Sequence, residues 1–342
     1  MTLPLAPGHD AVATFGTVEE DYAALRERAA LIDRSARTRF LFTGAQGAET
    51  LNGLVTNDVA GLVGGAGLYA ASLSAKGKTV ADLRVFARAG DFLVDVAPAA
   101  ATGFSAMLRK YVNPRLARFA DVSGVLRTIG VYGPHAANVV AAGTGAERAH
   151  LLLLAPYHHL QVDGAGGSVL VARVPDLGVE GFDLFVPVEA AAQLWGRLAE
   201  CGGEPVGTAA AEIARVEAGR PLWSVDMDEA TLAQEANLDE LHAVSYTKGC
   251  YTGQETVARV HFRGHVNRHL RGLRSEQLLP RGAALVGADG VGVGDVRSAV
   301  VSPRLGPIAI AMVRHEVPAA AHLTARWDDG DARARVCELP FE

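Results

Sequence analysis

The stretch Tyr246-Thr-Lys-Gly-Cys-Tyr-Thr-Gly-Gln-Glu255 is the most informative part of this 342-residue chain. Gly249 and Gly253 bracket three residues, a spacing that predicts a tight loop. Lys248 stands two residues before Cys250, and a nearby ammonium group favours the thiolate, which is the nucleophilic form of cysteine. Composition alone favours the alternative, in which Cys250 is a small buried hydrophobic side chain. A functional thiol in this loop is the second interpretation.

Upstream of this loop, apolar residues recur with helical spacing in some segments and alternate in others. The pattern Thr17-Val-Glu-Glu20 is a capping box and predicts the start of the first helix. We expect helices over 18–33, 46–54, 99–112, 188–199 and 208–218, with one more after Pro134. We expect strands near 40–42 and over 67–73, 79–86, 92–96, 116–121, 125–132, 159–174 and 182–186, while the leucines 151–154 suit a core strand or a loop. Because these elements lack the regular βα repeat of a doubly wound sheet, the sequence predicts an α+β architecture.

Downstream of about residue 266 the helical period disappears. Short apolar runs separated by Gly and Pro follow, a pattern typical of a small antiparallel barrel. The runs cover 283–286, 291–296, 299–301, 308–313, 323–327 and 334–339. The sequence therefore predicts a C-terminal antiparallel β-barrel.

Composition excludes several classes of function. The 32 Lys and Arg residues face 38 Asp and Glu residues, and the net charge of −6 gives no overall attraction to DNA or to an anionic membrane. No segment reaches the roughly 18 apolar residues of a membrane span, and the first residues predict no secretory signal. Three scattered cysteines are too few for a disulfide framework. We expect a cytoplasmic protein.

Other motifs carry little chemistry. The glycine-rich stretch 287–294 lacks the G-x-G-x-x-G spacing and the following helix of a dinucleotide site. Neither a G-x-S-x-G elbow nor an H-E-x-x-H pair is present, so no serine hydrolase and no metal site is predicted. The arginines within 259–274 are typical of a solvated face, with RNA or an acidic partner protein as the functional alternative.

Asp82 is a second candidate. It lies within the expected strand 79–86, on the face that also carries Val80, Arg84 and Phe86. A carboxylate at this place either faces solvent beside Arg84 or lines a cavity. The residues alone favour solvent, because half-exposed antiparallel sheets are common.

Several longer segments resemble a known family. They are Arg215-Val-Glu-Ala-Gly-Arg-Pro-Leu-Trp-Ser-Val-Asp-Met-Asp-Glu229, Gln234-Glu-Ala-Asn-Leu-Asp239, Lys248-Gly-Cys-Tyr-Thr-Gly-Gln-Glu255 and Val257-Ala-Arg259, supported by 30–35, 54–59, 294–298, 302–306 and 308–311. On these residues the chain resembles the YgfZ-type folate-binding proteins, which belong to the superfamily of the glycine cleavage T-protein, an aminomethyltransferase. The resemblance covers most of the chain.

This resemblance implies a three-domain cloverleaf around a central channel that admits tetrahydrofolate. The first α+β, ferredoxin-like domain would comprise 1–45 and 126–240, and the second α+β domain 46–125. The signature loop segment would cover 241–265, and the barrel 266–342.

The resemblance also implies site residues. Gly77-Lys-Thr-Val-Ala-Asp-Leu83 is similar to a T-protein segment whose second aspartate lies beside the reactive folate nitrogens, and Asp82 takes that position. Leu177-Gly-Val-Glu-Gly-Phe-Asp183 stands where T-proteins carry a segment whose acids hold the pterin. Val179 replaces the first glutamate, so this pterin contact is either lost or passes to Glu180 or Asp183. Arg215 is expected near the polar or glutamate end of the folate. The signature loop comprises Lys248, Gly249, Cys250, Tyr251, Gly253, Gln254 and Glu255, and it is expected at the channel mouth.

Three functions follow from the resemblance. The first is a tetrahydrofolate-binding accessory protein that supports iron–sulfur cluster assembly or repair and the tRNA modification that depends on it, with Cys250 and Asp82 as the reacting groups. The second is a folate-dependent aminomethyltransferase. The third is a non-enzymatic interaction protein with a vestigial folate channel. Iron–sulfur enzymes or cluster assembly proteins would be the partners of the first.

Overall fold

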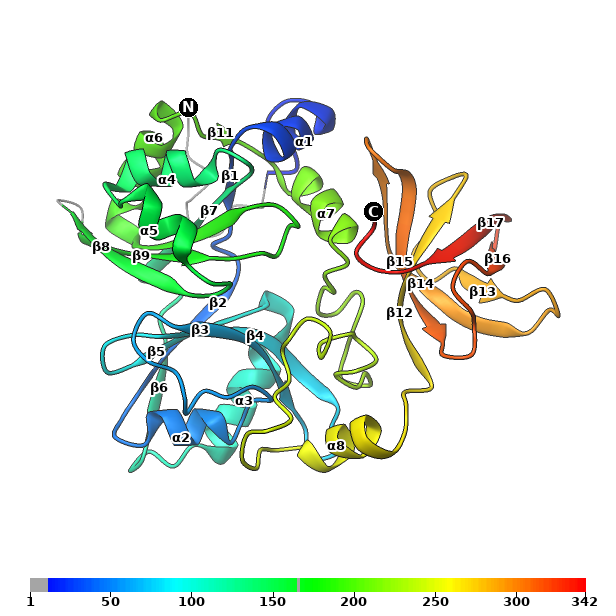
Figure 1. Ribbon diagram of the computed structural model, residues 1–342, viewed down its shortest axis with the longest axis horizontal. Coiled ribbons are helices and arrows are strands. Elements are labelled where there is room, and N and C mark those ends of the chain that lie inside the picture. Colours follow the sequence, from blue (N-terminus) through cyan, green and yellow to red (C-terminus); the bar gives the residue numbers. More distant parts are fainter. Residues whose placement is uncertain (1–11, 165–166) are drawn as a thin grey trace.

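The computed structural model describes residues 12–164 and 167–342. Two α+β units and a barrel are arranged around the segment that follows α7 (Figure 1). The predicted α+β class and C-terminal barrel are confirmed. Within the described residues, no helix is both long and apolar enough to span a membrane.

The first sheet contains six strands of the described chain in the order β11-β1-β7-β10-β9-β8. Its neighbouring strands are antiparallel except for the parallel pair β1 and β11. Their bounds are β1 Ala30–Asp33, β7 Leu126–Tyr132, β8 His159–Gly164, β9 Gly167–Arg173, β10 Gly181–Pro187 and β11 Glu204–Pro205. The accompanying helices are α1 Val18–Glu27, α4 Ala136–Thr144, α5 Arg148–Leu153, α6 Val188–Glu200 and α7 Thr208–Glu217. Buried Leu194, Trp195 and Leu198 of α6 pack on this sheet and form one core.

The second sheet contains five described strands, all antiparallel to their neighbours, in the order β3-β4-β5-β2-β6. Their bounds are β2 Thr38–Thr43, β3 Gly67–Leu73, β4 Thr79–Ala87, β5 Phe92–Val96 and β6 Arg118–Asp121. The helices beside them are α2 Gly47–Asn52, the short 3₁₀ turn η1 Pro98–Ala100 and α3 Ala101–Tyr111. Phe104 of α3 packs edge-on against Phe40 of β2, with 5.7 Å between ring centroids. Since β2 pairs with β5 and β6, residues before 46 contribute to both sheets, unlike the expected division between 45 and 46.

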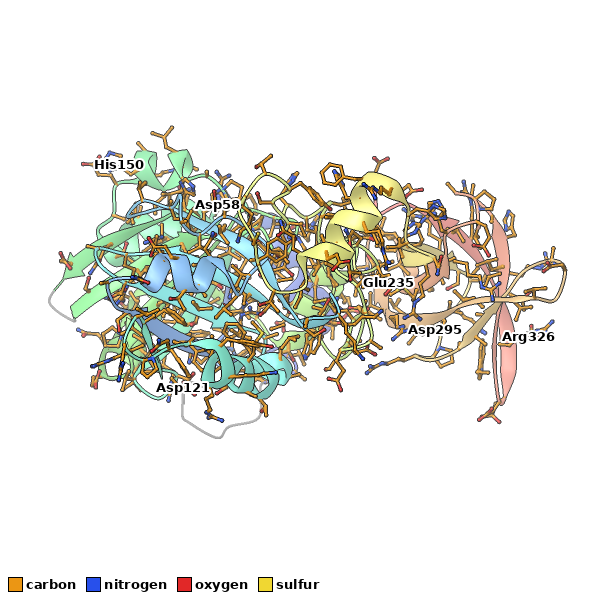
Figure 2. All side chains as sticks on the ribbon, turned by 90° about the horizontal axis from the view of Figure 1, so that it is seen from below. Asp58, Asp121, His150, Glu235, Asp295 and Arg326 are labelled. Carbon is orange, nitrogen blue, oxygen red and sulfur yellow. The ribbon has the colours of Figure 1, made fainter. Side chains whose placement is uncertain are left out.

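The barrel closes in the order β12-β15-β14-β13-β16-β17. Its strands are β12 Arg268–Ser275, β13 Ala284–Val286, β14 Gly292–Ser302, β15 Gly306–Arg314, β16 His322–Trp327 and β17 Gly330–Cys337. Seen from below, the barrel projects well beyond the two sheets (Figure 2). Glu235 joins the parts, because its carboxylate lies 3.1 Å from Arg268 and 4.0 Å from Lys78.

Predictions that rest on neighbouring residues are correct where no distant strand pairs with the segment. Thr17 and Glu20 form the predicted capping box. Gly77 turns the β3–β4 hairpin at φ +77°, a region in which glycine avoids the strain of a side chain.

Four expectations are wrong, and tertiary pairing explains most of them. The helix expected over 18–33 ends at Glu27, because 30–33 pair with β7 and β11 as strand β1. The strand expected over 159–174 is instead two antiparallel strands, β8 and β9, and residues 165–166 lie outside the described residues. Leu151 is the buried anchor of helix α5, whereas Leu153 is 81% exposed, so the leucine run is neither strand nor loop. Helix α8, Gln254–Arg263, occupies part of the basic stretch in which no helix was expected.

Candidate functional site

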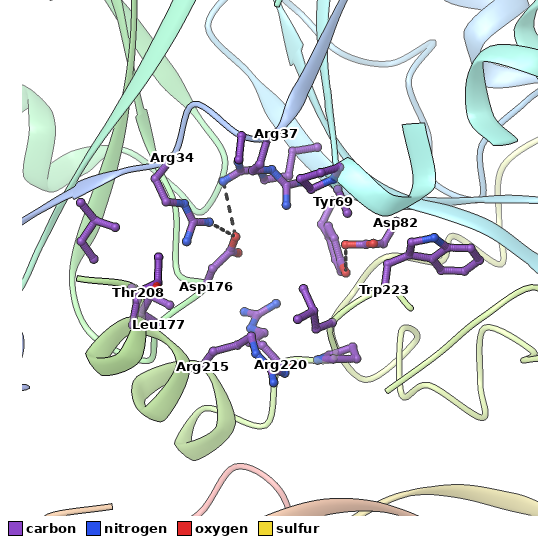
Figure 3. A pocket seen from close by; sticks show the side chains of 18 of the residues that line it. Arg34, Arg37, Tyr69, Asp82, Asp176, Leu177, Thr208, Arg215, Arg220 and Trp223 are labelled. Atoms are coloured by element: carbon purple, nitrogen blue, oxygen red, sulfur yellow. Dashed lines mark hydrogen bonds and ion pairs between the residues drawn. The ribbon is translucent and has the colours of Figure 1, made fainter. Parts of the chain in front are cut away.

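A cavity of about 300 Å³ opens between the two sheets and helix α7. Each side contributes charged residues, and Figure 3 shows Asp82 and Tyr69 opposite Asp176 and Arg34, with Arg215 and Arg220 along the lower edge. Leu177, Leu222 and Trp223 provide apolar walls. The cavity therefore combines apolar surface with a few convergent polar groups, as small-molecule sites commonly do.

Asp82 projects into this cavity from the centre of β4. Its side chain is buried, so the solvent-facing interpretation is wrong. Tyr69 of the neighbouring strand donates a hydrogen bond of 3.0 Å to Oδ2, while buried Oδ1 has no hydrogen-bond partner among the described residues. Burial raises the pKa of the carboxyl group above its ordinary value, because desolvation disfavours the charged form more than Arg37 and Tyr69 favour it. Asp82 thus offers an unused acceptor to a ligand.

A network of buried ion pairs holds the wall behind Asp82. Arg84 is fully buried and donates to Asp95 and, over 2.7 Å, to Asp183. Arg37 donates to Asp95 over 2.6 Å. Burial opposes ionisation of Asp95, but Arg37 and Arg84 outweigh it and hold its pKa below the ordinary value. The network fixes the second sheet to the first, since Asp183 lies on β10.

The side of the cavity facing Asp82 carries Asp176. This carboxylate accepts a hydrogen bond of 3.2 Å from Tyr157, whose ring stacks on Tyr69 with 5.8 Å between centroids. Burial would raise the pKa of Asp176, but Arg84, Arg220 and Arg34 lower it overall. The cavity therefore holds two aspartates whose pKa values are shifted in opposite directions.

Two arginines near the end of α7 differ in how many of their N–H donors are free to bind a ligand. Arg215 donates to Glu212, Asp226, Ser298 and the carbonyl oxygen of Arg220, which occupy all of its nitrogen atoms. Among the described residues, Arg220 has one side-chain hydrogen bond, at 3.4 Å to Tyr157. A guanidinium group has five N–H donors in a planar fork, so Arg220 retains donors for a carboxylate.

Glu180 and Asp183, which were expected at the pterin, and Val179, which departs from that pattern, do not line this cavity. Asp183 is buried behind the cavity wall, where it also accepts a hydrogen bond of 2.7 Å from Tyr132. Glu180 lies 3.9 Å from Arg173 in an ion pair. Val179 packs on the cluster around α1 and α7. Among the described residues that line the cavity, none of these three is found.

The signature loop is anchored by Lys248. Its ammonium group donates to the carbonyl oxygens of Asn52 (2.6 Å), Val55 (2.9 Å) and Asn57 (2.7 Å), at and just beyond the end of α2. An ammonium group has three donors, so these contacts use all of them. Burial nevertheless lowers the pKa of Lys248 to about 8. The contacts indicate that Lys248 positions the loop, unlike the expected role beside the thiol.

Close packing explains why residue 253 of the loop is a glycine. Gly253 has φ +81°, and a Cβ atom there would lie 2.5 Å from the carbonyl oxygen of Ser74 at the β3–β4 turn. Thr256 of α8 donates to the carbonyl oxygen of Lys76 in the same turn. Tyr251 is buried, Gly249 is exposed, and Gln254 and Glu255 begin α8. The loop therefore fills the space between α2 and the hairpin.

Cys250 is exposed at the surface of this loop. None of the residues 246–255, all of them described, lines the cavity. The structure thus brings Asp82 and Arg215 together at one cavity and leaves Cys250 outside it.

Comparison with known proteins identifies the family. Residues 8–247 match the family described as "GCVT N-terminal domain", and residues 268–341 match "Glycine cleavage T-protein C-terminal barrel domain". The chain belongs to the glycine cleavage T-protein family. The superfamily expected from the sequence is confirmed.

Relatives within this family carry the name aminomethyltransferase. That of Rubrobacter xylanophilus is 29% identical over 339 residues, covering 98% of this chain and 88% of the relative. That of Bordetella pertussis is 30% identical over 355 residues, covering 98% and 90%. The glycine cleavage system aminomethyltransferase T of Bartonella henselae has a solved structure with a TM-score of 0.87 at 22% identity, covering 100% of this chain and 98% of that chain. At that identity the likeness establishes the shared GcvT-like fold.

Sequence reasoning missed several cavity residues in this family fold. Tyr69, Arg37, Asp176 and Arg220 line or border the cavity, and none was a candidate. A signal existed for two of them, since Asp176 directly precedes the compared segment 177–183 and Arg220 lies inside 215–229. Tyr69 had no comparable signal, because only strand pairing places it beside Asp82.

Proposed function

We propose that this chain binds a reduced folate in the cavity between its sheets and transfers a one-carbon group, as a folate-dependent aminomethyltransferase. The observation that carries the proposal is Asp82, which lines the cavity and whose buried Oδ1 has no hydrogen-bond partner among the described residues. The shared name of the relatives supports the reaction class. The cavity lies at the lower end of the range of about 300–1,000 Å³ typical of ligand sites.

Asp82 is suited to a folate nitrogen. A carboxylate oxygen accepts the hydrogen bond of an N–H group, and a carboxyl group with a raised pKa can hold or release a proton during transfer. Burial also raises the pKa of Tyr69 well above its ordinary value, so its hydroxyl stays a donor and orients Asp82. Excluding water from the cavity strengthens both interactions.

We assign the glutamate end of the folate to Arg220. Arg215 is committed to Glu212, Asp226 and Ser298, and a ligand would have to displace one of them. Arg220 faces the same cavity with donors to spare. This assignment replaces the expected role of Arg215 with one that keeps α7 attached to the barrel.

Calorimetry under anaerobic conditions tests the proposal. Tetrahydrofolate is titrated into the wild-type protein, Asp82→Asn, and the exposed control Asp163→Asn. We expect binding by the wild type and the control, and binding about 10- to 100-fold weaker in Asp82→Asn, the loss of one hydrogen bond to a charged group. Transfer of a labelled aminomethyl carbon to tetrahydrofolate then tests catalysis. Absence of folate binding at millimolar concentration would favour the interaction protein with a vestigial channel.

A second candidate function rests on Cys250. Its exposure on a loop rigidly held by Lys248 and Gly253 favours an accessory protein that presents a thiol to iron–sulfur enzymes or cluster assembly proteins. Under this second proposal the chain is of the YgfZ type and supports the tRNA modification that depends on iron–sulfur enzymes. Recovery of iron–sulfur enzyme activity in cells that lack the protein is the test. Wild type should restore the activity, Cys250→Ala should not, and Cys201→Ala is the matched control for an exposed thiol.

A further inference from the structure

Tyr157 lies between the two α+β units without lining the cavity. It belongs to the segment between α5 and β8 of the first unit, and its side chain is buried. Its ring stacks on that of Tyr69 in β3 of the second unit, with 5.8 Å between the ring centroids and 16° between the ring planes. Among the described residues that line the cavity, Tyr69 is found and Tyr157 is not. Tyr157 therefore supports the cavity from outside.

The backbone of Tyr157 is held in an uncommon conformation. Its φ angle is +65°, in the left-handed region that bulky side chains rarely adopt. The N–H group of Tyr157 donates a hydrogen bond of 2.7 Å to the carbonyl oxygen of Arg173, and the N–H group of Arg173 donates to the carbonyl oxygen of His158. A Cβ atom on Gly67 of β3 would lie 2.2 Å from the carbonyl oxygen of Tyr157, so only glycine leaves room for it. The surroundings thus enforce a strained conformation, as they often do at functional positions.

The hydroxyl group of Tyr157 connects two residues of the cavity. It donates a hydrogen bond of 3.2 Å to Asp176 and accepts one of 3.4 Å from Arg220. Burial raises the pKa of Tyr157 above its ordinary value, so the hydroxyl group stays protonated and keeps its donor for Asp176. Among the described residues, Tyr157 is the one hydrogen-bond partner of the Arg220 guanidinium group. The direction of that group therefore depends on the Tyr157 hydroxyl group.

The ring of Tyr157 acts on the opposite wall of the cavity. Tyr69 donates its hydrogen bond to Asp82, and the stacked ring of Tyr157 restricts how Tyr69 can turn. Figure 3 shows Tyr69 beside Asp82, with Asp176 and Arg220 on other sides of the same cavity. One side chain outside the cavity thus contacts residues on more than one of its walls.

We propose that Tyr157 is a positioning residue for the one-carbon transfer, and that its ring and its hydroxyl group serve different ends of the folate. The ring orients Tyr69 and thereby the carboxyl group of Asp82, so it governs the rate of transfer. The hydroxyl group orients Arg220, so it governs the affinity for the glutamate end. This inference rests on the proposed function.

Two variants separate the ring from the hydroxyl group. Tyr157→Phe keeps the stacked ring and removes both hydrogen bonds. Tyr157→Asn removes the ring as well, and asparagine tolerates the positive φ angle of this position. Tyr111→Phe, at the exposed end of α3, is the matched control. Calorimetry compares tetrahydrofolate with tetrahydropteroate, which lacks the glutamate, and the transfer assay gives the rate at saturating tetrahydrofolate.

The two variants should differ in what they lose. In Tyr157→Phe we expect tetrahydrofolate to bind about three- to tenfold more weakly, while the affinity for tetrahydropteroate stays that of the wild type. In Tyr157→Asn the transfer rate at saturation should fall about tenfold or more, because a displaced reacting group slows the reaction. Tyr157→Phe should restore most of that rate. A merely structural role would instead lower affinity and rate together in both variants.

The outcomes separate this inference from the proposed function. Equal tetrahydrofolate affinities of the wild type and Tyr157→Phe overturn the inference alone, and so does a wild-type transfer rate in Tyr157→Asn. Absence of folate binding and transfer in the wild type overturns the proposed function and this inference with it. If Tyr157→Asn does not fold, Tyr157→His replaces it, because histidine also lacks the phenol ring, is accepted at positive φ angles and must also slow the transfer.

Discussion

The cavity and the signature loop 246–255 are built on opposite principles. The cavity is formed by charged side chains on two sheets, and its central carboxylate keeps one buried oxygen without a partner among the described residues. In the loop, the ammonium group of Lys248 uses all three of its donors, on the carbonyl oxygens of Asn52, Val55 and Asn57. A distinctive motif can therefore reflect close packing, while a buried carboxylate oxygen without a hydrogen-bond partner among the described residues lies in an ordinary strand.

The largest effect is expected within the cavity wall. Arg84→Met should lower the free energy of unfolding by about 3–5 kcal/mol, because it leaves Asp95 and Asp183 as buried charges with fewer partners. Arg88→Gln is the matched control near the end of the same strand, where the ion pair with Asp91 is partly exposed and worth about 1 kcal/mol or less. Urea unfolding of both variants measures the difference. Equal losses would mean that the buried network contributes no more than a surface pair.

Asp82→Asn should weaken tetrahydrofolate binding about 10- to 100-fold and leave the fold intact. The stability of this variant distinguishes a binding role from a structural one. Burial raises the folded-state pKa of Asp82 above its ordinary value of 3.8. Relative to Asp82→Asn, the wild type is therefore most stable below the unfolded pKa and loses stability as the pH rises through the folded pKa. Urea unfolding at pH 4 and pH 7 measures this trend, and a wild type that gains stability over the variant with rising pH would contradict it.

Lys248→Met should cost about 1–2 kcal/mol of unfolding free energy, because three carbonyl groups lose their donor. Lys76→Met, at the exposed hairpin tip, should have almost no effect. Since the ammonium group is occupied by carbonyl oxygens, the loss of Lys248 should not slow alkylation of Cys250. Markedly slower alkylation with iodoacetamide would restore Lys248 as the group that activates the thiol.

The smallest effect is expected for Cys250→Ala. Substitution of an exposed side chain usually changes the free energy of unfolding by no more than about 0.5 kcal/mol, and Cys250 is exposed and lies outside the cavity lining. Folate affinity should be unchanged in calorimetry. Among the native thiols, exposed Cys250 and Cys201 should react faster than Cys337, because burial raises the pKa of Cys337. A large loss of folate affinity in Cys250→Ala would mean that the loop contributes to folate binding, contrary to the difference between loop and cavity described above.

The elements that the sequence predicts correctly are those whose signals are local. Examples are the capping box of α1, the glycine turn between β3 and β4, and the alternating runs of the barrel. In each of these features, the residues that form the signal are close together in the sequence. Helix α1 shows the limit of such signals, because helical spacing continues through 30–33 while pairing with β7 makes this segment a strand. Backbone hydrogen bonds to a distant strand outweigh a weak local preference.

For the site, the sequence by itself singled out Asp82 and Cys250, and the family resemblance added Arg215, while the tertiary structure decided where each of these side chains lies. Asp82 is buried beside Tyr69, Arg215 is committed to the barrel, and Cys250 stays at the surface. Likewise, a cavity of about 430 Å³ is lined by Arg26 of α1, Arg220 after α7 and Arg304 of the barrel, which are far apart in sequence. The physical reason is that burial and charge pairing depend on which distant segments meet, and residue spacing along the chain does not record those meetings.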